Sequence, residues 1–214
     1  MKKKLLVFDM DGTILNTIED ITDAVNYILT KYDMPQRSLE EVRFFVGNGL
    51  LKTLERSVPE GTDAAFIQEI YPEFTAYYKE HAGVKTRPYD GITDVIRALK
   101  QSGYKLAVVS NKRQEAVLEL CDLHFKDCFD IAMGDQEGMQ IKPAPDMVLK
   151  VLHDLGILRE EAVYIGDSDV DLLTAQNSGL DCIAVSWGFR GRTFLEKHGA
   201  KIIIDAPQEI ESFV

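Results

Sequence analysis

The chain has 214 residues, of which 45% are hydrophobic and 28% are charged. This composition is typical of a globular protein with a sizeable core and excludes a disordered chain. The 24 basic and 35 acidic residues give a net charge of −11. That charge argues against general binding to nucleic acid or to an anionic membrane, because both need a basic surface.

Neither a membrane span nor a signal peptide is predicted. No stretch approaches the roughly 20 apolar residues of a span, and the first apolar run stops at Phe8, which is too short for a signal peptide. The three cysteines, Cys121, Cys128 and Cys182, form no CxxC pair, so we expect reduced thiols in packing roles. These features predict a cytoplasmic protein, and the sequence leaves monomer or homodimer open and indicates no protein partner.

A short buried strand is predicted at residues 4–9, and a helical region follows it. Apolar residues recur at helical spacing, Ser38 followed by Leu39 and two glutamates is typical of a helix N-terminus, and two glycines precede a further helical stretch. The predicted helices cover 18–32, a segment from Ser38, 50–57 and 62–81. We therefore expect an α-helical insertion over residues 16–84, without strands.

Strands and helices alternate from residue 87 onward. The predicted strands cover 105–110, 130–133, 162–166, 181–185 and 201–204, and the helices cover 92–101, 113–123, 145–155, 169–178 and 192–198. Strands that are apolar on both faces and separated by helices indicate a parallel sheet with crossovers. The predicted fold class is α/β: a doubly wound, Rossmann-like parallel sheet core, residues 1–15 and 85–214, with the helical domain inserted after its first strand.

Polar residues follow the strands at the edge where such sheets bind ligands, the carboxyl ends. The first strand ends in Asp9-Met10-Asp11-Gly12-Thr13, and the strand at 105–110 ends in Ser110-Asn111-Lys112. A loop with Lys142-Pro143 follows the next strand, and the strand at 162–166 leads into Gly166-Asp167-Ser168 with Asp171 beyond it. We expect these four segments to lie close together.

The acidic residues suit a hard divalent cation. Asp9 and Asp11 would project to the same side of an extended chain, and their repulsion requires a proton or a cation. With Asp167 they offer the oxygen ligands that Mg²⁺ prefers. The hydroxyls and lysines available to complete an anion cradle are Thr13, Ser110, Lys112 and Lys142. A metal, a lysine and a carboxylate nucleophile are the parts that phosphoryl transfer needs.

The four segments resemble the four motifs of haloacid dehalogenase-like phosphatases, in the family's order and over nearly the whole chain. The resemblance implies that Asp9 is the nucleophile and forms an aspartyl-phosphate. It implies that Asp11 is the general acid and then the base, and that Lys142 stabilises the nucleophile and the transferring charge. The other implied roles are phosphoryl binding by Thr13, Ser110 and the backbone of Asn111, and Mg²⁺ binding by Asp9, Asp11 (through its carbonyl), Asp167 and Asp171, the last directly or through neighbouring groups.

The same resemblance implies that the helical insertion is a mobile cap whose residues set specificity, with hinges at residues 16–17 and 81–85. Gly47, Asn48 and Gly49 open a predicted helix, where exposed N–H groups can receive an anion. This stretch, and Val185-Ser186-Trp187-Gly188, resemble phosphoglycolate phosphatases. The predicted activity is therefore hydrolysis of a small phosphorylated metabolite, phosphoglycolate first.

Several alternatives stay open at this point. A pyrophosphatase, a sugar-phosphate phosphatase or a phosphomutase would share the core motifs, and a binding module could retain the fold without activity. A dehalogenase is disfavoured, because it does not need Asp11. Lys112 is either solvated or a local source of positive charge, Trp187 either borders the site or packs in the core, and Asp169 has no assigned role.

Overall fold

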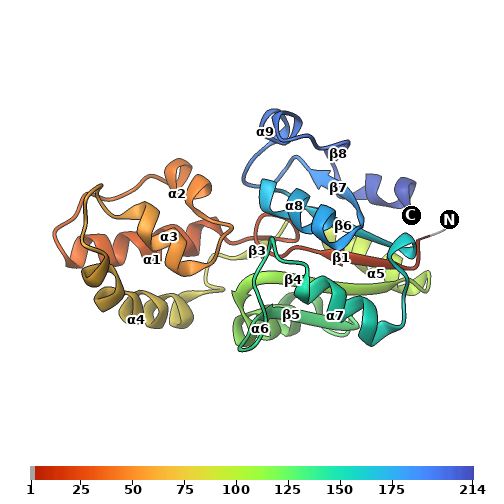
Figure 1. Ribbon diagram of the computed structural model, residues 1–214, viewed down its shortest axis with the longest axis horizontal. Helices are drawn as coiled ribbons and strands as arrows, with labels where there is room; N and C mark the ends of the chain where they lie inside the picture. Colours follow the sequence, from red (N-terminus) through yellow and green to blue (C-terminus); the bar gives the residue numbers. More distant parts are fainter. Residues whose placement is uncertain (1–2) are drawn as a thin grey trace. The chain divides into compact units, whose positions relative to one another are not determined.

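The computed structural model describes residues 3–214 (Figure 1). Its contacts divide the chain into two compact units. Unit 1 is Met1–Asn16 with Pro88–Val214, and unit 2 is Thr17–Arg87. Across the residues described, none of the helices has both the length and the apolar character that crossing a membrane requires.

Unit 1 is built on a six-stranded parallel sheet in the order β5-β4-β1-β6-β7-β8. The strands are β1 (Leu5–Phe8), β4 (Lys105–Arg113), β5 (Ile131–Asp135), β6 (Ala162–Gly166), β7 (Asp181–Val185) and β8 (Ile202–Ile204). The predicted doubly wound α/β fold is confirmed. β4 runs three residues further than expected, with a register irregularity between Val109 and Arg113, so the polar residues after Val109 lie within the strand.

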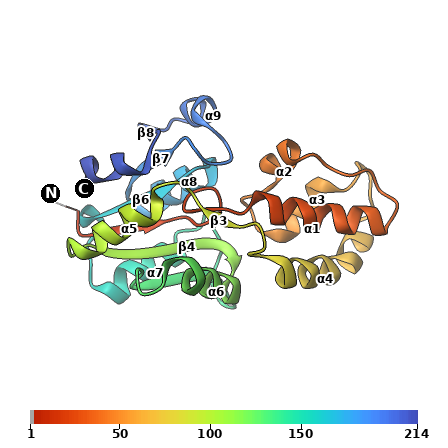
Figure 2. The ribbon, with the colours of Figure 1, turned by 180° about the vertical axis from the view of Figure 1, so that it is seen from behind.

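Helices cover both faces of this sheet because successive strand residues point to opposite sides. Leu6 and Phe8 pack with α5 (Ile92–Gln101), α6 (Gln114–Phe125) and the 3₁₀ helix η2 (Pro207–Phe213). Leu5 and Val7 pack with α7 (Asp146–Leu155) and α8 (Asp169–Ser178). Figure 1 shows α7 and α8 in front of the sheet, and Figure 2 shows α5 from the other side. The remaining elements of unit 1 are η1 (Arg159–Glu161) and α9 (Arg192–Lys197).

The three cysteines are free thiols. Cys121 and Cys128 are buried in the core on the α5 and α6 side, and Cys182 packs on the opposite face. Burial raises the pKa of Cys121 to about 12, so this thiol is unreactive, as expected for a packing residue.

Unit 2 consists of four helices: α1 (Ile18–Lys31), α2 (Leu39–Phe45), α3 (Leu50–Ser57) and α4 (Ala64–His81). Ser38 begins α2 with a capping box to Glu41, and the Asp63 side chain caps α4, so local capping chemistry fixes both starts.

Two short strands that the sequence did not reveal, β2 (Leu15–Asn16) and β3 (Arg87–Pro88), pair with each other.

A buried carboxylate in α1 binds the last segment of unit 2 through hydrogen bonds. Asp20 accepts hydrogen bonds from the backbone N–H groups of Gly83, Lys85 and Thr86 at 2.9 Å each, and from the Thr86 hydroxyl at 2.7 Å. Residues 81–85 were expected to act as a hinge, but residues 83–86 are held to α1 by these bonds. The hinge expected at residues 81–85 stays a prediction.

Candidate active site

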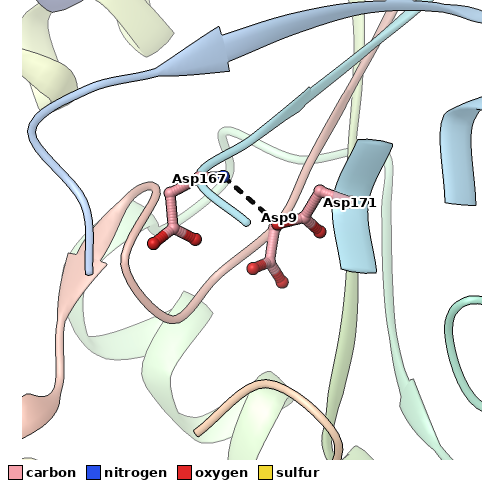
Figure 3. Close-up of side chains that lie close together, drawn as sticks. All are labelled: Asp9, Asp167 and Asp171. Atoms are coloured by element: carbon pink, nitrogen blue, oxygen red, sulfur yellow. Dashed lines mark hydrogen bonds between the residues drawn. The ribbon is translucent and has the colours of Figure 1, made fainter. Parts of the chain in front are cut away.

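Three acidic side chains from two strand ends and one helix meet at the carboxyl edge of the sheet. Asp9 follows β1, Asp167 follows the adjacent β6, and Asp171 lies in the first turn of α8. One carboxylate oxygen from each lies within 4.8 Å of the others, and Figure 3 shows this cluster. All three side chains are buried, which is costly for carboxylates unless nearby positive charge compensates.

Lys142 supplies part of that charge from the loop before α7. Its ammonium group lies 2.7 Å from Oδ1 of Asp9, 2.8 Å from Oδ1 of Asp171 and 3.1 Å from the Tyr164 hydroxyl. The three N–H donors of a lysine are thereby matched by three acceptors. Lys142 is thus held beside Asp9, and its role in stabilising the nucleophile stays a prediction.

Asn111 determines where the backbone of Lys142 lies. Its side-chain amide donates to the Lys142 carbonyl at 3.0 Å and accepts from the Lys142 N–H at 2.7 Å. This two-way contact links the end of β4 to the loop that carries the lysine. The side chain of Asn111 therefore positions Lys142, and the phosphoryl contact expected from the Asn111 backbone stays a prediction.

Asp171 is fully occupied by hydrogen bonds. Oδ1 accepts from Lys142 and from Tyr164, and Oδ2 accepts from the N–H groups of Asp167 and Ser168 at 3.1 Å and from the Ser168 hydroxyl at 2.6 Å. The bond from Asp167 is the dashed line in Figure 3. Asp171 therefore orients both the lysine and the loop of Asp167.

The backbone approaches the Asp167 side chain closely from two segments. Its Oδ2 accepts a 2.6 Å bond from the N–H of Phe189, and the Thr13 hydroxyl lies 3.5 Å from Oδ1. A Cβ at Gly12, where φ is +88°, would lie 2.5 Å from Oδ2, and one at Gly188 would lie 2.3 Å from the Asp167 Cβ. Glycine is required at both positions for the chain to approach this carboxylate so closely.

The charges of the site are out of balance. Four aspartates (Asp9, Asp11, Asp167, Asp171) and two buried lysines (Lys112, Lys142) leave a formal charge of −2, and the neighbouring ion pair of Arg190 with Asp169 adds no net charge. Burial and Asp171 raise the pKa of Asp9 well above its usual value, which Lys142 offsets only in part. Burial and Asp171 also raise the pKa of Asp167 to about 7. Burial lowers the pKa of Lys142, but Asp171 and Asp9 outweigh this and hold it well above normal.

This excess of negative charge indicates whether the residues of the site suit a metal. Clustered buried carboxylates with raised pKa values would gain from a divalent cation, which would offset the formal charge of −2. An all-oxygen donor set suits a hard cation such as Mg²⁺. The residues present therefore fit a divalent metal.

The remaining predicted core residues lie around the same edge. Thr13 and Ser110 are buried, and the Ser110 hydroxyl accepts from the backbone N–H of Lys112 at 3.2 Å. Lys112 is buried and forms a 3.1 Å ion pair with Oδ1 of Asp11. The interpretation of Lys112 as a solvated side chain was therefore wrong, and it is a local source of positive charge.

The predicted anion-binding loop belongs to unit 2. Gly47 and Gly49 both have positive φ, and Gly49 is the residue before α3. Arg56 donates to the Asn48 side chain and to the Phe45 carbonyl, both at 2.9 Å, so a cation holds the loop in shape. Substrate binding by these three loop residues stays a prediction.

Two residues were missed or left open by the sequence. Tyr164 completes the contacts of Lys142, and the available signal was a tyrosine in the middle of an otherwise aliphatic buried strand, because a buried hydroxyl needs a partner. Trp187 donates from its indole nitrogen to the Thr13 carbonyl at 3.0 Å. It therefore both borders the loop after β1 and packs against the core.

Comparison with known proteins identifies the family of this chain. A profile of the haloacid dehalogenase-like hydrolases matches residues 6–185. A phosphoglycolate phosphatase of Aquifex aeolicus is 32% identical over 187 residues, covering 87% of this chain and 86% of that protein. Pyrophosphatase PpaX of Bacillus cereus (strain AH820) is 29% identical over 213 residues, covering 98% and 95%.

Solved structures share the fold over the full chain. A crystal structure of a "putative phosphoglycolate phosphatase" from Lactobacillus delbrueckii subsp. bulgaricus has a TM-score of 0.94 and 39% identity, covering 100% of this chain and 98% of that one. CbbY from Rhodobacter sphaeroides, solved with phosphate, has a TM-score of 0.72 and 26% identity, covering 97% and 96%. The chain belongs to the haloacid dehalogenase-like hydrolases. Within that family it is a phosphatase.

Proposed function

We propose that this chain is a Mg²⁺-dependent phosphomonoester hydrolase that works through an aspartyl-phosphate on Asp9, with phosphoglycolate as its preferred substrate. The observation that carries the proposal is the bond from Lys142 to Oδ1 of Asp9 inside the buried carboxylate cluster. It leaves Oδ2 of the same carboxylate to attack phosphorus. A positioned and charge-compensated nucleophile is what phosphoryl transfer mainly requires.

The reaction would proceed in two displacements. In the first, Oδ2 of Asp9 bonds to phosphorus, the ester P–O bond breaks, and Asp11 gives a proton to the departing oxygen. In the second, a water molecule attacks phosphorus and gives a proton to Asp11, and the bond to Asp9 breaks to release inorganic phosphate. Lys142 stabilises the carboxylate and the charge that is transferred, and Thr13 and Ser110 bind phosphoryl oxygens.

The residues that would hold the metal are Asp9, Asp167 and the backbone carbonyl of Asp11. A divalent cation there would supply positive charge that offsets both the clustered carboxylates and the phosphoryl group. Asp171, with both oxygens engaged, would act by orienting Asp167 and Lys142. The helices of unit 2 would form a cap that excludes water, and Gly47, Asn48 and Gly49 would contact the substrate.

The full-length similarity to a protein named as a pyrophosphatase favours pyrophosphate hydrolysis as the second candidate. Pyrophosphate and phosphoglycolate both present a phosphoryl group bonded to a small anionic leaving group. Both reactions could use the same core residues. The cytoplasmic location and the monomeric or homodimeric state expected from the sequence stay predictions.

Phosphate release from a substrate panel tests the proposal. The panel contains phosphoglycolate, pyrophosphate, hexose phosphates and nucleoside monophosphates, with Mg²⁺ and with EDTA, and Asp9→Asn is the control that keeps side-chain size. A lead for phosphoglycolate of about 10²-fold in kcat/KM, worth about 2.7 kcal/mol of transition-state discrimination, supports the assignment. A higher kcat/KM for pyrophosphate than for phosphoglycolate favours the second candidate. Wild-type activity in Asp9→Asn refutes the role of Asp9 as the nucleophile.

A further inference from the structure

A second lysine is buried at the site, and its ion pair is with Asp11. Lys112 follows Asn111 in β4, and its side chain is 3% exposed. Its ammonium group lies 3.1 Å from Oδ1 of Asp11. At the other end of the same strand Lys105 is 53% exposed and pairs with Asp130 on the surface. A long, flexible side chain normally carries its charge to water, so the retention of this ammonium inside unit 1 requires a reason.

The two buried lysines serve different ends of the reaction centre. Lys142 is committed to Asp9, Asp171 and Tyr164. Lys112 is next to Asp11, the group that meets the departing oxygen in the proposed reaction. Its charge is therefore located on the side of the leaving group rather than on the side of the nucleophile.

We infer that Lys112 is a specificity-determining residue that selects substrates whose leaving group carries an anionic group close to the departing oxygen, a carboxylate or a second phosphate. The inference rests on the proposed function and names the substrate class of the same site. An ammonium group carries three N–H donors and can serve two anionic partners at once. In the complex Lys112 contacts the substrate's anionic group while it remains close to Asp11.

This assignment explains a feature that the two named relatives share. Phosphoglycolate releases glycolate and pyrophosphate releases phosphate, and both leaving groups are small anions. A buried cation beside the leaving group would favour either one over a neutral alcohol, because an ion pair is strengthened where water is excluded. One determinant of specificity then lies in unit 1, in addition to those expected in unit 2.

The test uses a matched pair of substrates that differ in one charge. Phosphoglycolate and its carboxamide analogue have nearly the same shape, but only the first has an anionic leaving group. We expect the wild type to prefer phosphoglycolate by at least about tenfold in kcat/KM. Lys112→Met should lose about 10- to 100-fold on phosphoglycolate, the value of one charge-assisted hydrogen bond, and less than about threefold on the amide. Lys105→Met is the control and should change neither.

Three results would overturn the inference. An equal loss on both substrates in Lys112→Met would mean that the lysine only supports Asp11 or the fold. A wild type without preference between the two substrates would exclude selection by charge, even if the variant did not fold. The absence of any Asp9-dependent turnover would refute the proposed function and the inference with it, whereas the first two results leave the proposed function intact.

Discussion

The carboxylate of Asp20 is expected to be worth several kcal/mol to unit 2. It is buried in α1 and accepts from three backbone N–H groups of residues 83–86 and from the Thr86 hydroxyl. Burial alone raises its pKa, but the hydrogen bonds from Thr86, Gly83 and Lys85 together outweigh burial and hold the pKa below its usual value. The carboxylate is therefore stabilised in its charged form by the segment that it holds.

The geometry sets the size of the effect for two substitutions. In Asp20→Asn the amide oxygen can replace Oδ2, but its NH₂ group then faces the N–H of Lys85, so one charge-assisted bond is lost and the others become neutral. We expect a loss of about 2–3 kcal/mol. In Asp20→Ala all of the donors lose their partner, and we expect about 3–5 kcal/mol, because several buried N–H groups stay unsatisfied.

The pH dependence follows from the lowered pKa of Asp20. A carboxyl group whose pKa is lower in the folded state stabilises the fold above its unfolded value, about pH 3.9, and loses this contribution as the pH falls through the folded value. The difference between wild type and Asp20→Asn should therefore be complete at pH 7 and shrink below about pH 4.

Urea unfolding followed by far-ultraviolet circular dichroism measures the loss. Trp187, the single tryptophan, lies in unit 1 and does not report on unit 2. Hydrogen exchange of the peptide that contains residues 83–86 therefore measures the loss of stability locally. Asp23→Asn is the matched control: Asp23 is on the same helix and pairs with the Lys85 side chain at the surface, and we expect a change within about 0.5 kcal/mol. Unchanged exchange at residues 83–86 and an unchanged unfolding midpoint in Asp20→Ala would refute the reasoning.

Three further outcomes are expected at the active site. Tyr164→Phe removes the hydroxyl between Lys142 and Asp171, and kcat should fall about 5- to 10-fold with KM within twofold, because a buried donor loses its acceptor; an unchanged kcat contradicts this. Gly188→Ala places a Cβ 2.3 Å from that of Asp167, and an activity titration should need at least about tenfold more Mg²⁺. Protons compete with the metal at Asp167, whose pKa is about 7, so the apparent Mg²⁺ dissociation constant should rise about tenfold per pH unit below pH 7; isothermal titration at pH 5.5 to 8 checks this, and a flat profile opposes it.

The fold and the core of the site could be predicted because both follow from local patterns. Apolar runs separated by amphipathic helices determine a parallel sheet, and the polar residues directly after β1 and β6 must share its carboxyl edge. Asp9, Asp167 and Lys142 were found in this way. The short strands β2 and β3 could not be predicted, since two residues have no periodicity and their pairing joins segments more than 70 residues apart.

The contacts that involve side chains from distant segments were beyond sequence reasoning. Whether Lys112 reaches water depends on the path of the chain around β4, and the sequence allows both a solvated and a buried position. The side-chain amide of Asn111 is engaged by the backbone of a loop 31 residues further on, a contact that its motif did not indicate. Asp20 looked like an ordinary helix residue, and its partners lie more than 60 residues away.

The pattern of engaged oxygens divides the acidic cluster into two roles. Asp171 accepts at both oxygens from five donors of the protein, so a metal bound to it would have to displace bonds that hold Lys142 and Asp167 in place. Asp9 has one oxygen on Lys142, and Asp167 has one on the Phe189 N–H and the other only 3.5 Å from Thr13. Oδ1 of Asp167, at the end of β6, is therefore the side-chain oxygen best able to accept a cation without disrupting the site, since the proposed reaction uses Oδ2 of Asp9, at the end of β1, to attack phosphorus. Asp167 would then hold the cation near the nucleophile, while Asp171, in the first turn of α8, orients Lys142 toward Asp9.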